Sequence, residues 1–468
     1  MKKIVSIIIC SFALISHIHA SDTLQKQTWA GKLNVNGMEL TLVLNTLRVS
    51  PDSLTATLDS PDQGAKGIPV SRISITDDSL KFTVNNLMAR FGGRFSAGKD
   101  TLAGLFVQAG YKIPLILAAQ KEAFRLTRPQ EPKPPFSYDV EEVIVRNLKD
   151  SIELSGTLTL PRGDGPFPAI VLVTGSGAQN RDEEIFGHKP FLLLADRLTS
   201  LGFAVLRYDD RGTGKSTGNF GTATTLDFAT DAISAIRFLK GRKEIDTVRI
   251  GILGHSEGAL VAEIVAAEGR DAAFIVLLAG PALTGEEIIR LQSELIARTN
   301  GVPEELIRTN LELNKQIFSV VKKTSDNRKA AARIRKILED YEKKSSGKEE
   351  AKAAPQSQID AQIRTVTSPW FRVFLTLDPM RYIERIKCPV LALYGGLDLQ
   401  VPPAENMKAM ESGLLIAGND QYTVDYVPGV NHMFQTATTG SPSEYGAIEE
   451  TISPVVLEMV GNWLKREL

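Results

Sequence analysis

The chain has 468 residues, a length that suggests about two or three domains. Hydrophobic residues make up 43 % of it, which is enough for a sizeable buried core. The 54 lysines and arginines nearly balance the 55 aspartates and glutamates, and the formal net charge is −1. This balance argues against nucleic acid or an anionic membrane as a partner.

The first residues have the features of a targeting segment. Lys2 and Lys3 precede an apolar run over residues 4–15, and Ala20 offers a small residue for cleavage. We therefore expect a signal peptide over residues 1–20 and a periplasmic or secreted protein. The apolar run is too short to span a bilayer, so no membrane anchor is expected. After cleavage Cys388 would be the only cysteine, which excludes an internal disulfide and a paired-thiol metal site.

Residues 21–128 consist of short runs in which apolar and polar residues alternate, separated by turn-forming residues. This pattern predicts a small antiparallel β domain, either a barrel or a sandwich. The domain contains no histidine and no catalytic constellation. A packing role and a substrate-positioning role both remain open for it. The runs lie at residues 32–35, 39–44, 54–58, 72–75, 80–84 and 90–95.

A proline-rich linker over residues 129–136 separates this domain from an alternation of strands and helices. Two lead-in strands are expected at residues 141–146 and 152–160. Buried strands are expected at residues 169–174, 204–208, 249–253, 274–279, 390–394 and 422–427, and helices at 191–201, 225–240, 257–268 and 454–468. Nearly continuous apolar strands that alternate with helices predict a mostly parallel sheet with helices on both faces.

The alternation is interrupted between the strands at 274–279 and 390–394. Residues 284–350 are charged and have a helical pattern with few glycines. We expect residues 281–384 to form a helical cap inserted over the active site, and residues 137–280 and 385–468 to form the core domain.

The sequence Gly254-His255-Ser256-Glu257-Gly258 follows an apolar strand and precedes an alanine-rich helix. G-x-S-x-G between a strand and a helix is the nucleophile elbow of the α/β-hydrolase fold. The turn is tight, so a side chain at either flanking glycine would clash. It exposes the Ser256 hydroxyl and directs the helix N-terminus, including the Glu257 N–H, at the reacting oxyanion.

A serine nucleophile needs a general base, and the base needs an orienting carboxylate. In this fold the chain order is Ser, then Asp or Glu, then His. His432 follows the last predicted strand and fits the base, whereas His188 precedes the serine and His255 adjoins it. Asp398 lies just after the strand at 390–394, where open α/β sheets place their chemistry. Asp420 and Asp425 fit the role of the acid less well, because one precedes a strand and the other lies within it.

The second oxyanion donor is expected in the small-residue loop after the first parallel strand, with the Ser176 N–H preferred and Gly177 next. The same loop does not complete a dinucleotide-binding motif, because Asn180 occupies the position of the third glycine. The stretch at 212–216 resembles the end of a P-loop, but Asp209 replaces its first glycine. The sequence has no H-E-x-x-H motif, so neither a catalytic metal nor another cofactor is expected.

Several motifs in residues 137–468 resemble those of bacterial α/β-hydrolase esterases of the EstD-like group, which is related to the serine aminopeptidase and dienelactone hydrolase branches. They are Gly175-Ser176-Gly177, Asn180-Arg181-Asp182-Glu183, Gly187-His188-Lys189-Pro190, residues 207–212, the elbow, and Ser368-Pro369-Trp370-Phe371. The resemblance implies carboxylesterase activity on short acyl chains, with Ser256, Asp398 and His432 in the triad positions. It defines the reaction better than the natural substrate.

The hypothesis is therefore a periplasmic serine carboxylesterase that acts on a small-molecule ester without a cofactor. An aminopeptidase of the same fold is the main alternative, and Glu183, Glu184 or Glu257 would then anchor a substrate amine. A non-catalytic protein that binds a glycan or a partner is a third alternative, which the Ser–Asp–His order disfavours.

Overall fold

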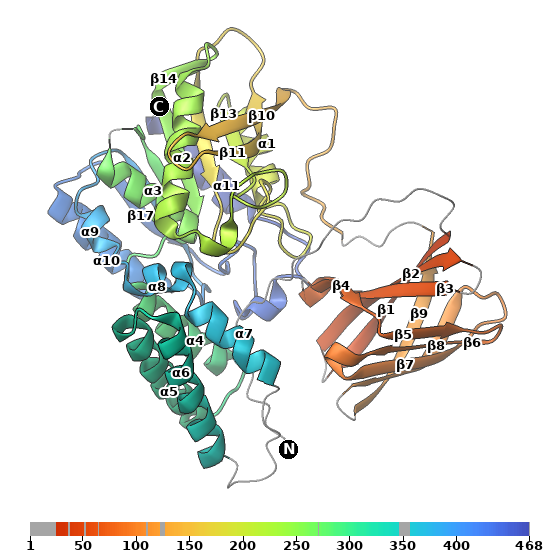
Figure 1. Ribbon diagram of the computed structural model, residues 1–468. Helices are drawn as coiled ribbons and strands as arrows, with labels where there is room; N and C mark the ends of the chain where they lie inside the picture. Colours follow the sequence, from red (N-terminus) through yellow and green to blue (C-terminus); the bar gives the residue numbers. More distant parts are fainter. Residues whose placement is uncertain are drawn as a thin grey trace.

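The computed structural model describes residues 25–35, 38–50, 53–63, 65–108, 111–121, 127–269, 271–345 and 356–467. The expected signal peptide lies outside these residues. Figure 1 shows a β-rich N-terminal domain beside a larger α/β body, which carries a block of helices. The chain thus has the α/β-hydrolase fold with a helical cap, preceded by an antiparallel β domain, as the sequence predicted.

The N-terminal domain is a strongly curved sheet of nine strands in the order β4-β3-β2-β1-β9-β8-β7-β6-β5. Its neighbouring strands pair antiparallel, and alternate side chains fill its interior with an apolar cluster that includes Trp29, Leu44 and Phe82. The strands are β1 (Gln25–Val35), β2 (Met38–Ser50), β3 (Ser53–Ser60), β4 (Ala65–Pro69), β5 (Arg72–Ile75), β6 (Ser79–Val84), β7 (Ala89–Phe95), β8 (Thr101–Gln108) and β9 (Tyr111–Gln120).

Strands β4, β8 and β9 were not among the expected runs. In β9 the reason is Pro114, because a proline within a run argues against a strand. Here β1 pairs with residues 118–120 of β9, beyond the proline, while Pro114 itself lies opposite Leu105 of β8. The tertiary pairing therefore overrides the local signal.

The core domain contains an eight-stranded sheet in the order β10-β11-β13-β12-β14-β15-β16-β17. The lead-in strands β10 and β11 are antiparallel, and the strands from β12 to β17 run parallel. They are β10 (Asp139–Asn147), β11 (Ile152–Leu160), β12 (Phe167–Val173), β13 (Ala204–Tyr208), β14 (Ile245–His255), β15 (Ile275–Leu278), β16 (Val390–Gly395) and β17 (Tyr422–Val427).

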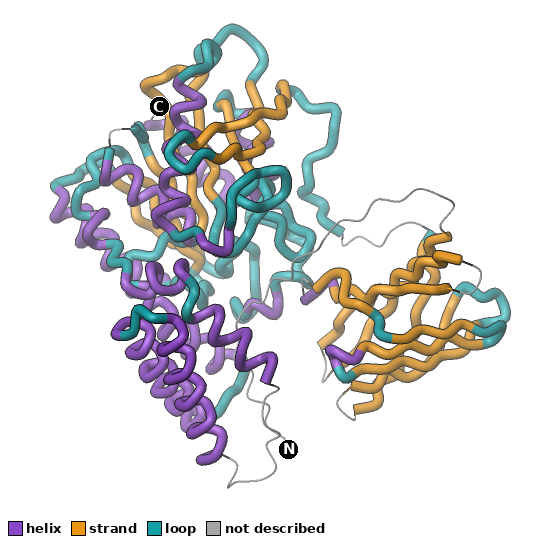
Figure 2. Tube along the Cα trace, viewed as in Figure 1, coloured by secondary structure: helices purple, strands orange, loops and turns teal. Residues whose placement is uncertain are grey.

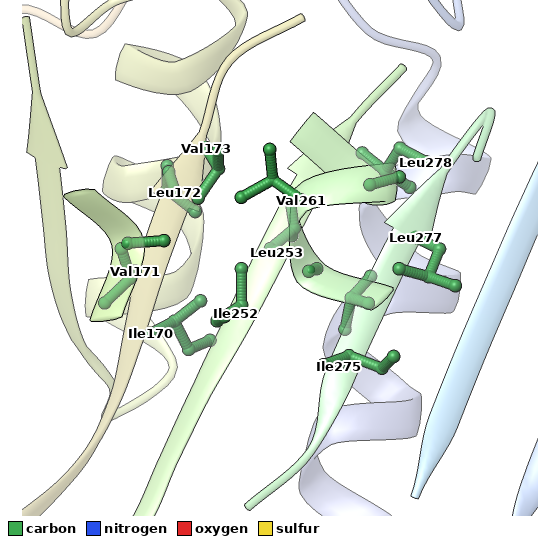
Figure 3. Close-up of a cluster of buried hydrophobic side chains, with 14 of the residues drawn as sticks. Ile170, Val171, Leu172, Val173, Ile252, Leu253, Val261, Ile275, Leu277 and Leu278 are labelled. Carbon is green, nitrogen blue, oxygen red and sulfur yellow. The ribbon is translucent and has the colours of Figure 1, made fainter. Parts of the chain in front are cut away.

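Helices cover both faces of this sheet. Helices α2 (Thr225–Lys240) and α3 (Glu257–Glu268) pack together on one face, and α1 (Pro190–Ser200) and α11 (Pro454–Glu467) pack together on the other (Figure 1). Helix α10 (Pro403–Ala417) packs on β16 and β17. The central strands therefore lie in an apolar environment on both sides, where Ile170, Ile252 and Leu277 are completely buried (Figure 3).

The cap is a separate block of helices between β15 and β16, and Figure 2 shows it as a purple region without strands. It has an apolar core of its own, which includes Phe318, Ile334 and Phe371. Its helices are α4 (Gly285–Thr299), α5 (Glu304–Lys323), α6 (Asn327–Ser345), α7 (Gln356–Val366) and α8 (Pro369–Thr376). The short helix α9 (Met380–Ile383) follows them and packs on α3 and α10 of the core domain. Short 3₁₀ helices occur at Pro61–Gln63, Asn85–Leu87, Phe220–Thr222 and Pro442–Glu444.

The proline-rich segment is attached to the core domain by polar side chains. The Arg128 guanidinium donates hydrogen bonds to the carbonyls of Phe186, Gly446 and Ile448. The Gln130 side chain donates a hydrogen bond to the Ile452 carbonyl oxygen and accepts one from the Ile452 N–H. These contacts hold the junction between the domains against the core. Every helix among the described residues is too short or too polar to span a bilayer.

Candidate active site

The nucleophile elbow has the geometry of a strained, tightly packed turn. β14 ends at His255, α3 begins at Glu257, and Ser256 between them has φ 54° and ψ −118°. A non-glycine residue in such a conformation costs about 1–3 kcal/mol. A Cβ atom added to Gly254 would lie 2.1 Å from the Gly258 carbonyl oxygen, and one added to Gly258 would lie 2.0 Å from that of Val173. Both flanking positions therefore require glycine.

Asp398 and His432 are in contact at the carboxyl ends of neighbouring strands. Asp398 follows β16 and His432 follows β17, and the Oδ2 atom of Asp398 lies 2.8 Å from the Nδ1 atom of His432. The other carboxylate oxygen accepts hydrogen bonds from the backbone N–H groups of Gln400 and Val401. Both side chains are almost fully buried. The carboxylate is thus held in place and can fix one tautomer of the imidazole.

The elbow lies next to this pair. The ring of His255, the residue before Ser256, is 4.9 Å from the ring of His432, and its Nε2 atom lies 3.0 Å from the His432 carbonyl oxygen. In the part of the chain that the structure describes, no hydrogen bond joins the Ser256 hydroxyl to His432. Catalytic hydrogen bonds are often long without substrate and shorten in the reacting complex.

The loop after β12 lies against the nucleophile. A Cβ atom added to Gly175 would be 3.3 Å from the Ser256 Cβ atom. The side chain of the next residue, Ser176, lies close enough to the Glu257 carboxyl group to help lower its pKa. Glu257 begins α3, where the backbone N–H groups and the helix dipole favour negative charge. The Ser176 and Glu257 N–H groups remain our prediction for the oxyanion donors.

The Glu257 carboxyl group connects the elbow to the cap. It is buried, and its Oε1 atom accepts hydrogen bonds from the Thr225 hydroxyl at 2.6 Å and the Trp370 indole N–H at 2.7 Å. Burial raises the pKa of Glu257, and the hydrogen bonds from Thr225 and Trp370, together with the nearby Ser176 side chain, oppose that rise. Its Oε2 atom has no hydrogen-bond partner among the described residues. Trp370 belongs to α8, so the cap contacts the elbow directly.

A second acid–histidine contact lies beside the first, and the sequence analysis did not predict it. The Oε1 atom of Glu183 lies 3.0 Å from the Nδ1 atom of His255 and accepts a hydrogen bond of 2.8 Å from the Gly175 N–H. Burial lowers the pKa of His255, but the Glu183 carboxylate, the His432 carbonyl and the Asp398 charge together outweigh burial, and the pKa is raised overall. Glu183 and His255 are 72 residues apart, so no local pattern could reveal the contact.

The other candidates considered from the sequence lie elsewhere. Asp425 and Asp420 are exposed, and Asp425 accepts a hydrogen bond from the Tyr426 N–H. His188 is buried, with Nδ1 at 2.9 Å from the Thr451 hydroxyl and Nε2 at 3.1 Å from the Tyr445 carbonyl oxygen. Across the described ranges, no group of three or more histidine, cysteine or acidic side chains could hold a metal ion.

His188 gives a prediction about stability and pH. Burial, followed by the nearby Arg128 charge, lowers the pKa of His188 to about 4. In the unfolded chain the pKa of histidine is about 6.5, so the unfolded state binds more protons between these values. The free energy of unfolding should therefore fall by at most about 3 kcal/mol as the pH drops through this window.

Urea unfolding at several pH values between about 7 and 4 measures this effect in the wild type and in His188→Gln. We expect a shallower loss of stability in the variant, since other titrating groups are common to both proteins. Equal pH dependence in the two proteins would contradict the assignment of His188 as a neutral structural histidine.

Comparisons with known proteins show which family of hydrolases the chain is similar to. The family model described as "Serine aminopeptidase, S33" matches residues 189–436. Esterase EstD of Thermotoga maritima is 25 % identical over 334 residues, which are 70 % of this chain and 68 % of that protein. The putative hydrolase YtaP of Bacillus subtilis is 27 % identical over 172 residues, 31 % of this chain and 57 % of that protein.

Among solved structures, the Pyrococcus furiosus esterase Pf2001 is 16 % identical, with a TM-score of 0.43, over 74 % of this chain and 99 % of that one. The resemblance to bacterial esterases that the motifs indicated is confirmed by the family model and by the similarity to EstD. Because the family model covers more than half of the residues, the chain belongs to the serine aminopeptidase S33 family of α/β hydrolases.

Proposed function

We propose that this protein is a serine carboxylesterase that hydrolyses short-chain acyl esters through an acyl-enzyme on Ser256. The family and its esterase relatives support a hydrolase of the esterase type that acts on a small molecule. The observation that carries the finer proposal is the contact of 2.8 Å between Asp398 and His432 beside the elbow.

In this proposal the Ser256 oxygen attacks the ester carbonyl carbon, and His432 takes the hydroxyl proton. Asp398 keeps the imidazole in the tautomer that leaves Nε2 free, and it stabilises the imidazolium that forms. The tetrahedral oxyanion is held by the N–H groups of Glu257 and Ser176, and the loss of one such donor typically costs about 3 kcal/mol.

The intermediate then collapses and breaks the bond to the alcohol oxygen, which receives the proton from His432. Water attacks the acyl-enzyme in the second half of the reaction, with His432 again as the base. The acid leaves and the Ser256 hydroxyl is restored. No step requires a cofactor.

An aminopeptidase remains the second candidate, because the family model carries that description. Of the acidic residues considered as an amine anchor, Glu183 is occupied by His255 and Gly175, and Glu184 is exposed. The Oε2 atom of Glu257 is buried and has no hydrogen-bond partner among the described residues. Of these candidate anchors, Glu183 is therefore already engaged and Glu184 lies at the surface.

We also propose a periplasmic or secreted location. The proposal rests on the basic residues Lys2 and Lys3, the apolar run at residues 4–15 and Ala20.

The activity is tested with p-nitrophenyl acetate, butyrate and octanoate beside a panel of aminoacyl-p-nitroanilides. We expect ester turnover that falls with acyl length, and labelling by a fluorophosphonate probe, with both abolished in Ser256→Ala. Turnover of the anilides alone would move the assignment to an aminopeptidase. A wild type that neither turns over esters nor reacts with the probe would favour a binding protein.

The role of Asp398 gives a separate prediction. Replacing the carboxylate by an amide keeps its shape but favours the wrong imidazole tautomer, so kcat of Asp398→Asn should fall by about 10⁴-fold. Asp425→Asn is the matched control, because Asp425 is exposed on β17 and should leave kcat unchanged. Steady-state kinetics on p-nitrophenyl butyrate measures both, and equal activity of the two variants would rule out Asp398 as the orienting acid.

A further inference from the structure

The Glu183 carboxylate lies where three segments of the candidate active site meet. Its Oε1 atom accepts a hydrogen bond from the Gly175 N–H in the loop after β12, and the same atom contacts the Nδ1 atom of His255 on the elbow. The opposite ring nitrogen of His255 contacts the carbonyl oxygen of His432. One buried side-chain pair therefore links three segments. They are the loop at residues 175–177 (the oxyanion loop), the nucleophile turn at residues 254–258, and the loop that carries His432 (the base segment).

The hydrogen-bond partners determine how many protons this pair holds. A carbonyl oxygen can only accept, so the Nε2 atom of His255 must carry a proton to bond the His432 carbonyl. The contact between Nδ1 and the Glu183 oxygen needs a further proton between those two atoms. Because the same oxygen also accepts from Gly175, it is best satisfied as a carboxylate. The pair is then an imidazolium and a carboxylate.

We propose that Glu183 and His255 form a second acid–histidine pair, which positions the base segment and the oxyanion loop around Ser256. This inference rests on the proposed esterase function. Neither residue is assigned a contact with substrate, so both are positioning residues. They act by fixing the His432 backbone and the Gly175 backbone next to the nucleophile turn.

The buried setting makes this pair sensitive to substitution. Both side chains are almost completely buried, and a buried charge that loses its partner is strongly destabilised. A neutral imidazole has only one N–H group and cannot donate from both nitrogens. Replacing Glu183 by glutamine keeps the side-chain shape, but a single amide atom cannot both accept from the Gly175 N–H and donate to a neutral imidazole, so either the Gly175 bond or one contact of His255 is lost. A small displacement of His432 or of the oxyanion loop would follow.

Such a displacement should lower the rate of the chemical steps more than the affinity for substrate. A misplacement of about 1 Å at a catalytic group can reduce a rate by about 100-fold. For Glu183→Gln we expect kcat on p-nitrophenyl butyrate to fall by about 10- to 100-fold, with KM within about twofold of the wild-type value. The rate of fluorophosphonate labelling should fall in parallel, because the probe reacts with the same serine.

Two further variants separate pairing from a general loss of stability. Glu268→Gln removes a carboxylate from the exposed end of α3 and should leave kcat and the labelling rate unchanged. His255→Gln removes the other member of the pair. The double variant with both substitutions should be no slower than the slower of the two single variants, because the rate losses of groups that act as one unit are not additive. Thermal unfolding shows whether each variant is folded at the assay temperature. If Glu183→Gln is unfolded there, His255→Gln provides the same test.

The outcomes distinguish this inference from the proposed function. A wild type without ester turnover and without labelling would overturn both. If the wild type is active and Glu183→Gln is folded with the same kcat as the wild type, the positioning role alone is overturned. Additive losses in the double variant would show that the two residues act independently and would contradict the pair.

Discussion

The site depends on how closely two backbone segments approach each other at the elbow. Gly258, in the first turn of α3, leaves no room for a side chain against the Val173 carbonyl at the end of β12. The turn that permits this contact holds Ser256 at a positive φ of 54°, a backbone conformation that residues other than glycine rarely adopt. The surrounding sheet must supply the stability to hold it, and the fully buried β15 and the buried C-terminal parts of β12 and β14 do so.

Around this turn the protein buries three carboxyl groups, each with its own donors. Asp398 accepts hydrogen bonds from two backbone N–H groups and contacts His432. Glu183 accepts one from the Gly175 N–H and contacts His255. Glu257 accepts hydrogen bonds from the side chains of Thr225 and Trp370. Buried charges of this kind add little net stability, because desolvation offsets their attraction. Their benefit lies in orientation, since dipoles that are fixed in advance need not reorganise during the reaction.

The elements with strong local signals were predictable from the sequence. The strand at 204–208 and the helices at 225–240 and 257–268 have the predicted bounds, because apolar periodicity and turn residues define them locally. The positions of Asp398 and His432 after successive strands follow from the order of the fold. The contacts of Glu183 with His255 and of Trp370 with Glu257 were not predictable, since each joins residues far apart in the chain. β9 was missed because Pro114 gives a local signal that strand pairing overrides.

The central claim is that Ser256 carries the acyl group during turnover, and mass spectrometry tests it most directly. The enzyme is mixed with excess p-nitrophenyl butyrate, quenched in acid within the steady state and digested. We predict that the peptide containing Ser256 gains the mass of one butyryl group, and that fragmentation assigns this mass to the serine oxygen. Turnover with no such adduct on that peptide, or with the butyryl group on another residue, would contradict the account.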